Sequence, residues 1–177
     1  SLREETIRNG KANWFFCPCD AVIKKPFNPF IHLLRHYFSQ NIRGLSNRHY
    51  QYQRQFKSLI NKLHVISSTE GFSSVAAKDF IEKLNHSDNA FRFLLGLSLS
   101  TPDWDDLAPQ SRYQMAKDGI ISLILAESLL HPLLLQIEDS HWLDPSSKEL
   151  LVSLCQQLST FPIMLVVTSR TEASTEI

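Results

Sequence analysis

Two short runs of apolar residues stand out in the last third of the chain. They cover residues 133–137 and 163–167, and each follows a proline. Apolar runs of this length between breakers are typical of strands that are buried on both faces of a parallel sheet. Between them, Asp144 followed by Pro145 predicts the start of a helix with leucines at helical spacing. Strand, helix and strand in this order predict a right-handed crossover unit of an α/β sheet.

The first two thirds of the chain predict one more strand and several helices. An aromatic run at residues 14–17 lies between Gly10 and Pro18, and its length and flanks predict a strand. Elsewhere, apolar residues recur at intervals of three and four positions, which is the spacing of a buried helical face. This spacing predicts helices within residues 27–38, 47–97 and 110–130. Residues 1–9 are polar and end in Asn9-Gly10, which predicts a helix end, and residues 98–109 collect Ser, Thr, Asp and two prolines, which predict a loop.

These elements together predict the fold class. We expect an α/β fold in which a partial P-loop-type parallel sheet is flanked by helices and interrupted by an all-helical insertion. The insertion is expected at about residues 42–110, within a single truncated domain over residues 1–177.

Composition narrows the class of protein. Of the 177 residues, 43% are hydrophobic, which is enough for a compact core. Lysine plus arginine equals aspartate plus glutamate, at 18 each, so the zero net charge predicts no direct nucleic-acid binding by this segment. No stretch approaches the roughly 20 apolar residues of a membrane helix and no signal peptide is recognisable, so we expect a cytoplasmic protein without a membrane partner.

The cysteines and histidines do not predict a metal site. Cys17, Cys19 and Cys155 lack zinc-ligand spacing, and we interpret them as reduced thiols. His32 and His36 are four residues apart on one predicted helix, but no third ligand or adjacent glutamate accompanies them. Both histidines are therefore expected at the surface or at its boundary with the core.

The acidic pair Glu138 and Asp139 follows the first apolar run directly. Open α/β sheets bind ligands outside the carboxyl ends of their strands, which is where such a pair would lie. Magnesium is usually held there by one or two carboxylates together with phosphate oxygens, and a second carboxylate can activate water. The alternative is that the two acids only end a strand in solvent.

Two further features follow the apolar runs. Arg170 comes three residues after the second run, where it could contact a ligand at the same edge or stay a solvated cation. His141 and Trp142 follow the acids, and they predict either a turn that orients the acidic strand end or an aromatic cover for the next helix. The chain has no Gly-x-Ser-x-Gly elbow, so serine hydrolase chemistry has no support.

The segment at residues 132–144 resembles the Walker B region of the signal-transduction (STAND) and AAA-type P-loop ATPase domains of bacterial regulators. It has the apolar strand, the Glu-Asp pair, a spacer, His-Trp, a spacer and an aspartate. Residues 162–170 are similar to the next strand of that family with its sensor arginine. Weaker similarities are the Pro-Phe-Asn-Pro-Phe start at residues 26–30 and the Leu-Leu-Gly-Leu element at residues 94–97.

The resemblance implies roles for four residues and two cofactors, Mg²⁺ and ATP. Glu138 and Asp139 would divide magnesium positioning and water activation between them, in an order that the sequence leaves open. Arg170 would contact the terminal phosphate of ATP. The phosphate-binding loop, Gly-x-x-x-x-Gly-Lys-Ser/Thr, is absent from the 177 residues, but the start of the chain resembles the residues directly after such a loop. Ser1 is thus expected to be the magnesium-binding hydroxyl or its neighbour.

The resemblance also implies a function. We expect an ATP-binding and ATP-hydrolysing regulatory switch in a larger signalling or transcription-regulatory protein, inactive as this segment alone. Its expected partners are other domains of the same polypeptide, a protein partner or a second copy. One alternative is a catalytically inactive scaffold that binds a protein through its helical insertion. Another is an origin-recognition-like AAA ATPase acting on DNA, which would need a basic winged-helix region outside this segment.

Overall fold

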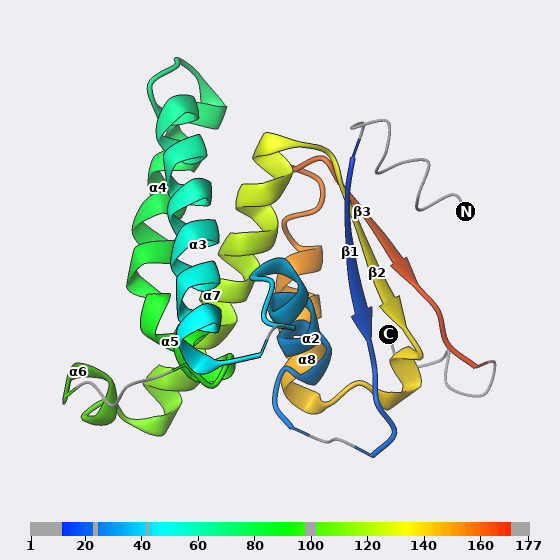
Figure 1. Cartoon of the computed structure of the whole chain (residues 1–177). Helices are drawn as coiled ribbons and strands as arrows, with labels where there is room; N and C mark the ends of the chain where they lie inside the picture. The colour runs from blue at the N-terminus through cyan, green and yellow to red at the C-terminus, as the bar shows by residue number, and fades with distance from the viewer. Residues whose placement is uncertain (1–11, 23–24, 42, 98–101, 171–177) are drawn as a thin grey trace. The chain divides into compact units, whose positions relative to one another are not determined.

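The computed structural model describes residues 12–22, 25–41, 43–97 and 102–170 (Figure 1). The chain divides into two compact units: a sheet unit of residues 1–33 and 127–177, and a helical unit of residues 34–126. Both divisions fall inside helices, namely α2 (Asn28–Tyr37) and α7 (Pro109–Leu130). The fold is mixed α/β, and the helical unit is wider than the insertion at residues 42–110 that the sequence predicts.

Three parallel strands form the sheet, in the order β1-β2-β3. They are β1 (Asn13–Pro18), β2 (Leu133–Glu138) and β3 (Ile163–Val167), so all three predicted strands are confirmed. Leu133 pairs with Asn13 on one side and with Ile163 on the other. Because the strands are parallel and in step, their carboxyl ends meet at one edge of the sheet (Figure 1).

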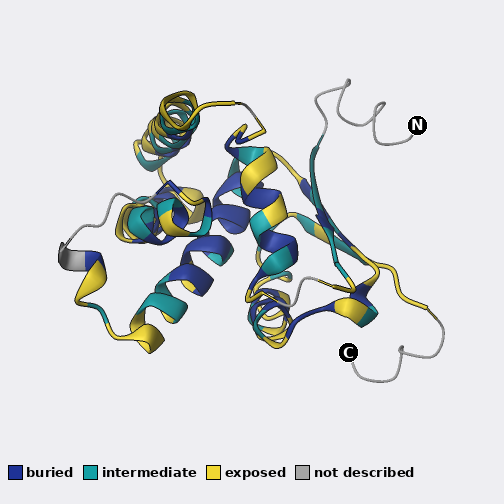
Figure 2. Cartoon of the chain, turned by 60° about the horizontal axis from the view of Figure 1, so that its bottom comes forward, coloured by how far each residue is buried: buried dark blue, intermediate teal, exposed yellow. Residues whose placement is uncertain are grey.

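Burial differs between the two faces of the sheet. On β2, Leu133, Leu135 and Ile137 are buried on one face, whereas Leu134 and Gln136 on the other face are only half-buried. Helix α8 (Pro145–Cys155) adds three buried leucines to the core of this unit, and α2 and α8 lie on the same side of the sheet (Figures 1 and 2).

Strand β3 is more exposed than its apolar pattern predicts. Its Met164 is 63% exposed, although strands of this composition are usually covered on both faces. Met164 pairs with Leu134 and lies on the same, less buried face of the sheet. Among the residues that the structure describes, β3 pairs with β2 alone, so it is an edge strand.

The helical unit contains α3 (Leu45–Ser67), α4 (Phe72–His86), α5 (Asp88–Leu94), the short α6 (Pro102–Asp105) and most of α7. Helices α3 and α4 pack side by side (Figure 1). Helix α6 lies within the stretch that the sequence predicts as a loop, while the predicted helix at residues 1–9 lies outside the described residues. No described helix has the length and apolar character needed to cross a bilayer.

An aromatic cluster with a polar rim forms the core of the helical unit. The Phe38 and Tyr52 rings lie 4.7 Å apart, and those of Phe38 and Phe91 lie 5.9 Å apart. The Tyr52 hydroxyl donates a hydrogen bond of 2.6 Å to Asp88 Oδ1, and Arg92 Nε donates one of 2.7 Å to Asp88 Oδ2. The pKa of Tyr52 is raised well above its usual value, mainly because its hydroxyl is buried and also because the Asp88 charge lies beside it.

Gly119 lets two helical segments of this unit approach closely. A Cβ atom at Gly119 would lie 2.6 Å from the Cβ of Ser87 and 3.2 Å from Cζ of Phe91. Ser87 is buried at the junction of α4 and α5. Glycine is therefore required by space here, since any side chain would overlap Ser87.

Candidate functional site

Hydrogen bonds join the chain after β2 to the chain after β3. The backbone N–H of Asp139 donates to Thr168 Oγ1 at 3.4 Å, and the backbone N–H of Ser140 donates to the Thr168 carbonyl at 2.9 Å. On the other side of β2, the Glu138 carbonyl accepts from the backbone N–H of Cys19 at 3.0 Å. The acidic pair is therefore held between the ends of both neighbouring strands.

The three described site residues that the sequence predicts share this edge. Glu138 is the last residue of β2 and Asp139 follows it, while Arg170 comes two residues after Thr168. All three are exposed, so a ligand in solvent can reach them. The fourth predicted residue, Ser1, lies outside the described residues.

Asp139 adopts a left-handed backbone conformation, with φ 55° and ψ 47°. Aspartate is one of the few residues other than glycine that visits this region readily. The conformation ends β2 abruptly and begins the 3₁₀ turn η1 (Ser140–Trp142). It thereby turns the chain out of the sheet at the position of the second carboxylate.

Buried polar atoms without partners lie directly after the acidic pair. Ser140 is 1% exposed, and neither its hydroxyl nor the two ring nitrogens of His141 have a hydrogen-bond partner among the described residues. Leaving a buried polar group unpaired costs about 1–3 kcal/mol, so such groups call for a water, a ligand or another segment. Trp142, in contrast, is 38% exposed, and its ring centroid lies 5.0 Å from that of His141.

Asp144 caps two helices at once. Its buried carboxylate accepts from the Ser147 backbone N–H at 2.9 Å and from the Ser147 hydroxyl at 2.6 Å, which confirms the predicted N-cap of α8. The same carboxylate accepts from the backbone N–H groups of Phe27 at 3.1 Å and Asn28 at 3.3 Å, where α2 begins. Asp144 is thus a structural residue that positions both turns.

Glu138 and Asp139 are the candidate metal ligands of this edge. Within the described ranges, no group of three or more His, Cys, Asp or Glu side chains is gathered as a metal site. Two carboxylates suffice for Mg²⁺ where phosphate oxygens and water complete its six ligands. The edge therefore presents two carboxylates, fewer than the four ligands that a structural zinc site needs.

The three cysteines are free thiols. Cys17 is buried, and burial together with the neighbouring Cys19 raises the pKa of the Cys17 thiol. Cys155 is exposed. His32 and His36 are both exposed, as predicted, and His32 makes an edge contact with the Phe16 ring at 6.3 Å.

Sequence reasoning missed two contributors to this site. Thr168 fixes the position of Asp139, and the only signal was a hydroxyl residue directly after the second apolar run. The link between Asp144 and Phe27 had no signal, because it spans 117 positions.

Comparison with known proteins gives one partial match and two negative results. Half of the chain, 88 residues, is 30% identical to part of an uncharacterized protein of Rhizobium meliloti (strain 1021). The match covers 8% of that relative, so the chain spans a small part of its length. No family model matches the chain, and no solved structure matches it.

Proposed function

We propose that this chain is part of a P-loop ATPase domain of the STAND/AAA kind, which acts as an ATP-dependent regulatory switch in a larger signalling or transcription-regulatory protein. The observation that carries the proposal is the shared edge of β2 and β3. Two adjacent parallel strands bring the carboxylates of Glu138 and Asp139 and the cation of Arg170 to the side of the sheet where α/β proteins bind ligands.

Each of these residues has a role in the proposed site. One carboxylate of the pair holds Mg²⁺ with the phosphate oxygens of ATP, and the other orients the attacking water. Neighbouring strands are about 4.8 Å apart, so an arginine beyond the end of β3 can reach a phosphate held near the acids. The hydrogen bonds from Asp139 and Ser140 to Thr168 keep the two strand ends in step during this contact.

The unpaired edge of β3 supports a missing strand. β3 is wholly apolar, as interior strands of parallel sheets are, yet among the described residues it pairs with β2 alone. We propose that a further parallel strand pairs there and is followed by the phosphate-binding loop, which is absent from these 177 residues. The loop would then present its backbone N–H groups at the same edge as the acidic pair. The much greater length of the Rhizobium relative leaves room for such a segment.

Ligand binding by the chain alone is the first test. Because the phosphate-binding amides and lysine are missing, calorimetry with Mg²⁺ and ATP should show affinity no better than millimolar. Micromolar affinity from these 177 residues would mean that the nucleotide site lies elsewhere.

Replacing Asp139 by Asn in a protein that contains both this chain and the phosphate-binding loop is the second test. Asparagine tolerates the left-handed backbone of Asp139, so the change removes the charge and keeps the turn. Hydrolysis should fall about 10²–10⁴-fold while nucleotide binding is retained. Asp106→Asn, at an exposed acid in the helical unit, is the matched control and should leave hydrolysis unchanged. Equal turnover of the wild type and Asp139→Asn would contradict the catalytic role.

A further inference from the structure

The zero net charge of the chain conceals a strong segregation of charge. Residues 21–69 contain no aspartate or glutamate and eight of the 18 lysines and arginines. The remaining residues therefore carry a formal excess of eight negative charges, which balances the eight positive charges of this stretch. The eight basic residues are Lys24, Lys25, Arg35, Arg43, Arg48, Arg54, Lys57 and Lys62. The attraction of a charged partner therefore depends on the charges of the surface that it meets, and not on the net charge of the whole chain.

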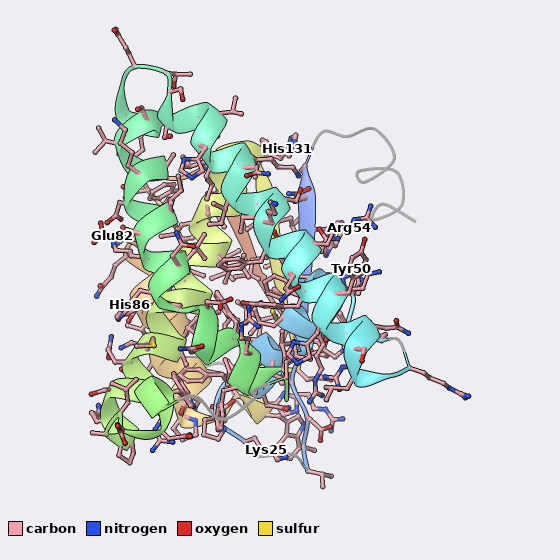
Figure 3. The ribbon with its side chains drawn as sticks, turned by 60° about the vertical axis from the view of Figure 1, so that its left-hand side comes forward. Lys25, Tyr50, Arg54, Glu82, His86 and His131 are labelled. Carbon is pink, nitrogen blue, oxygen red and sulfur yellow. The ribbon has the colours of Figure 1, made fainter. Side chains whose placement is uncertain are left out.

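Helix α3 carries three of these cations on one face. A shallow hollow along this helix is lined by side chains at intervals of three and four positions, which is one continuous helical face. The lining residues are Arg54, Lys57, Ser58, Asn61, Lys62 and Val65. We call this set the basic face of α3. Arg54, Lys57, Asn61 and Lys62 are exposed, and Figure 3 shows Arg54 one turn from the exposed Tyr50 on the same side of the helix.

The cations of this face are unpaired, unlike those of the neighbouring helix. In the part of the chain that the structure describes, Arg54, Lys57 and Lys62 make no ion pair. On α4, by contrast, Lys83 pairs with Asp79 at 2.7 Å. Figure 3 shows the α4 residues Glu82 and His86 on the side of the helix pair opposite Tyr50 and Arg54. The positive charge of α3 is therefore not neutralised within its own unit.

We propose that the basic face of α3 binds the phosphate backbone of duplex DNA. Five of its six side chains are hydrogen-bond donors of the types that contact phosphates, namely Arg, Lys, Asn and Ser, and the set contains no carboxylate. Arg54 and Lys62 are eight residues apart, which corresponds to about 12 Å along the helix axis. One DNA strand presents a phosphate about every 3.4 Å of duplex axis, so three cations over this length face three to four phosphates.

The composition of the face favours nucleic acid over an acidic protein. Protein–protein interfaces have aromatic or large apolar residues at their centre and are depleted in lysine. On the basic face of α3, Lys57, Ser58, Asn61 and Lys62 occupy the centre, and the one apolar residue of the set, Val65, lies at an end. A strongly positive, polar surface is typical of protein–DNA contacts. This proposal is independent of the ATPase proposal, because it uses the helical unit alone.

The proposal can be tested by fluorescence anisotropy. A labelled 20-base-pair DNA duplex is titrated with the 177-residue chain at several salt concentrations. The wild type should bind at low salt, and its affinity should fall steeply as salt rises. Substituting Arg54, Lys57 and Lys62 together by Gln should weaken binding at least tenfold and reduce the slope of log K against log salt by about three, one for each lost contact. These side chains are exposed, so circular dichroism should show an unchanged helical content.

The matched control changes the net charge equally at other exposed lysines. Substituting Lys78, Lys83 and Lys148 together by Gln on α4 and α8 should leave the affinity within about twofold of the wild type. Equal loss in the two triple variants would overturn the proposal, since it would indicate a response to total charge. Absence of binding to the duplex, or tighter binding to a polyglutamate peptide than to the duplex, would overturn it as well.

Discussion

The carboxylate of Asp144 accepts a hydrogen bond of 3.1 Å from the backbone N–H of Phe27, although the two residues are 117 positions apart. Phe27 has a positive φ of 60°, which is unusual for a bulky residue. Its ring is buried and α2 begins at the next residue. One carboxylate thus connects the turn after β1 with the turn after β2 and stabilises a strained backbone.

Replacing Asp144 by Ala should lower the free energy of unfolding by about 1.5–5 kcal/mol. The estimate combines the loss of the α8 N-cap, about 0.5–2 kcal/mol, with the unpaired N–H groups at Phe27 and Asn28, about 1–3 kcal/mol. The change in the free energy of unfolding can be measured by urea denaturation, monitored by circular dichroism. Asp106→Ala, the same change at an exposed acid, should cost less than about 0.5 kcal/mol. Equal effects of the two substitutions would contradict a special role for Asp144.

Gly119→Ala should destabilise the chain even though alanine favours helices. Alanine gains at most about 1 kcal/mol over glycine inside a helix, whereas overlap with a packed neighbour costs about 1–3 kcal/mol. The Cβ atom would lie 2.6 Å from the Ser87 Cβ, which cannot rotate away. Thermal unfolding should show a lower midpoint for Gly119→Ala. Adding Ser87→Gly should restore much of the loss, and a double variant no better than Gly119→Ala would disprove the steric cause.

Tyr52→Phe should destabilise the helical unit below pH 10 and have less effect above it. The hydroxyl bonds a carboxylate, and such a bond contributes about 1.5–3 kcal/mol. The pKa of Tyr52 is raised in the folded chain, whereas the unfolded residue ionises near pH 10, so stability due to this group is present below about pH 10 and lost as pH rises above it. Phenylalanine has no such loss, and the difference between wild type and variant should therefore shrink with rising pH.

Chemical denaturation at several alkaline pH values measures this difference. Tyr50→Phe provides the matched control, because Tyr50 is 62% exposed on the same helix. It should leave both the stability and its pH dependence unchanged. A constant cost of Tyr52→Phe from pH 7 to pH 11 would be inconsistent with the raised pKa.

Arg170→Ala tests the sensor role of the proposed ATPase. In a protein that contains the phosphate-binding loop, the substitution should weaken ATP about 10–100-fold and ADP much less, because only ATP offers the terminal phosphate. The size follows from a charged hydrogen bond of about 1.5–3 kcal/mol. Lys148→Ala, at an exposed cation on α8, should affect neither nucleotide. Equal weakening of ATP and ADP would mean that Arg170 supports binding without distinguishing the two.

Net charge is a whole-chain quantity that says nothing of how the charges are distributed over the surface. The equal numbers of acidic and basic residues led to the expectation of no nucleic-acid contact. The acid-free stretch over residues 21–69 was visible in the sequence, but nothing in it showed which cations would be exposed together. The structure places Arg54, Lys57 and Lys62 on one accessible face of α3, because Tyr52, Leu59 and Leu63 take the opposite, buried face.

The sequence alone determined the local elements. Proline-bounded apolar runs predicted β2 and β3, and the Asp144-Pro145 pair predicted the start of α8, because caps and strand ends depend on neighbours within a few residues. The position of the acidic pair directly after β2 was predictable for the same reason.

Only the tertiary structure decided the long-range relationships. These relationships join segments about 30 to 120 positions apart. They are the strand order, the bonds from Asp139 and Ser140 to Thr168, and the double cap by Asp144. The need for glycine at position 119 arises from Ser87, which lies against it only in the folded chain. Such contacts depend on the path of the whole chain, whereas the spacing of apolar residues constrains only the element to which they belong.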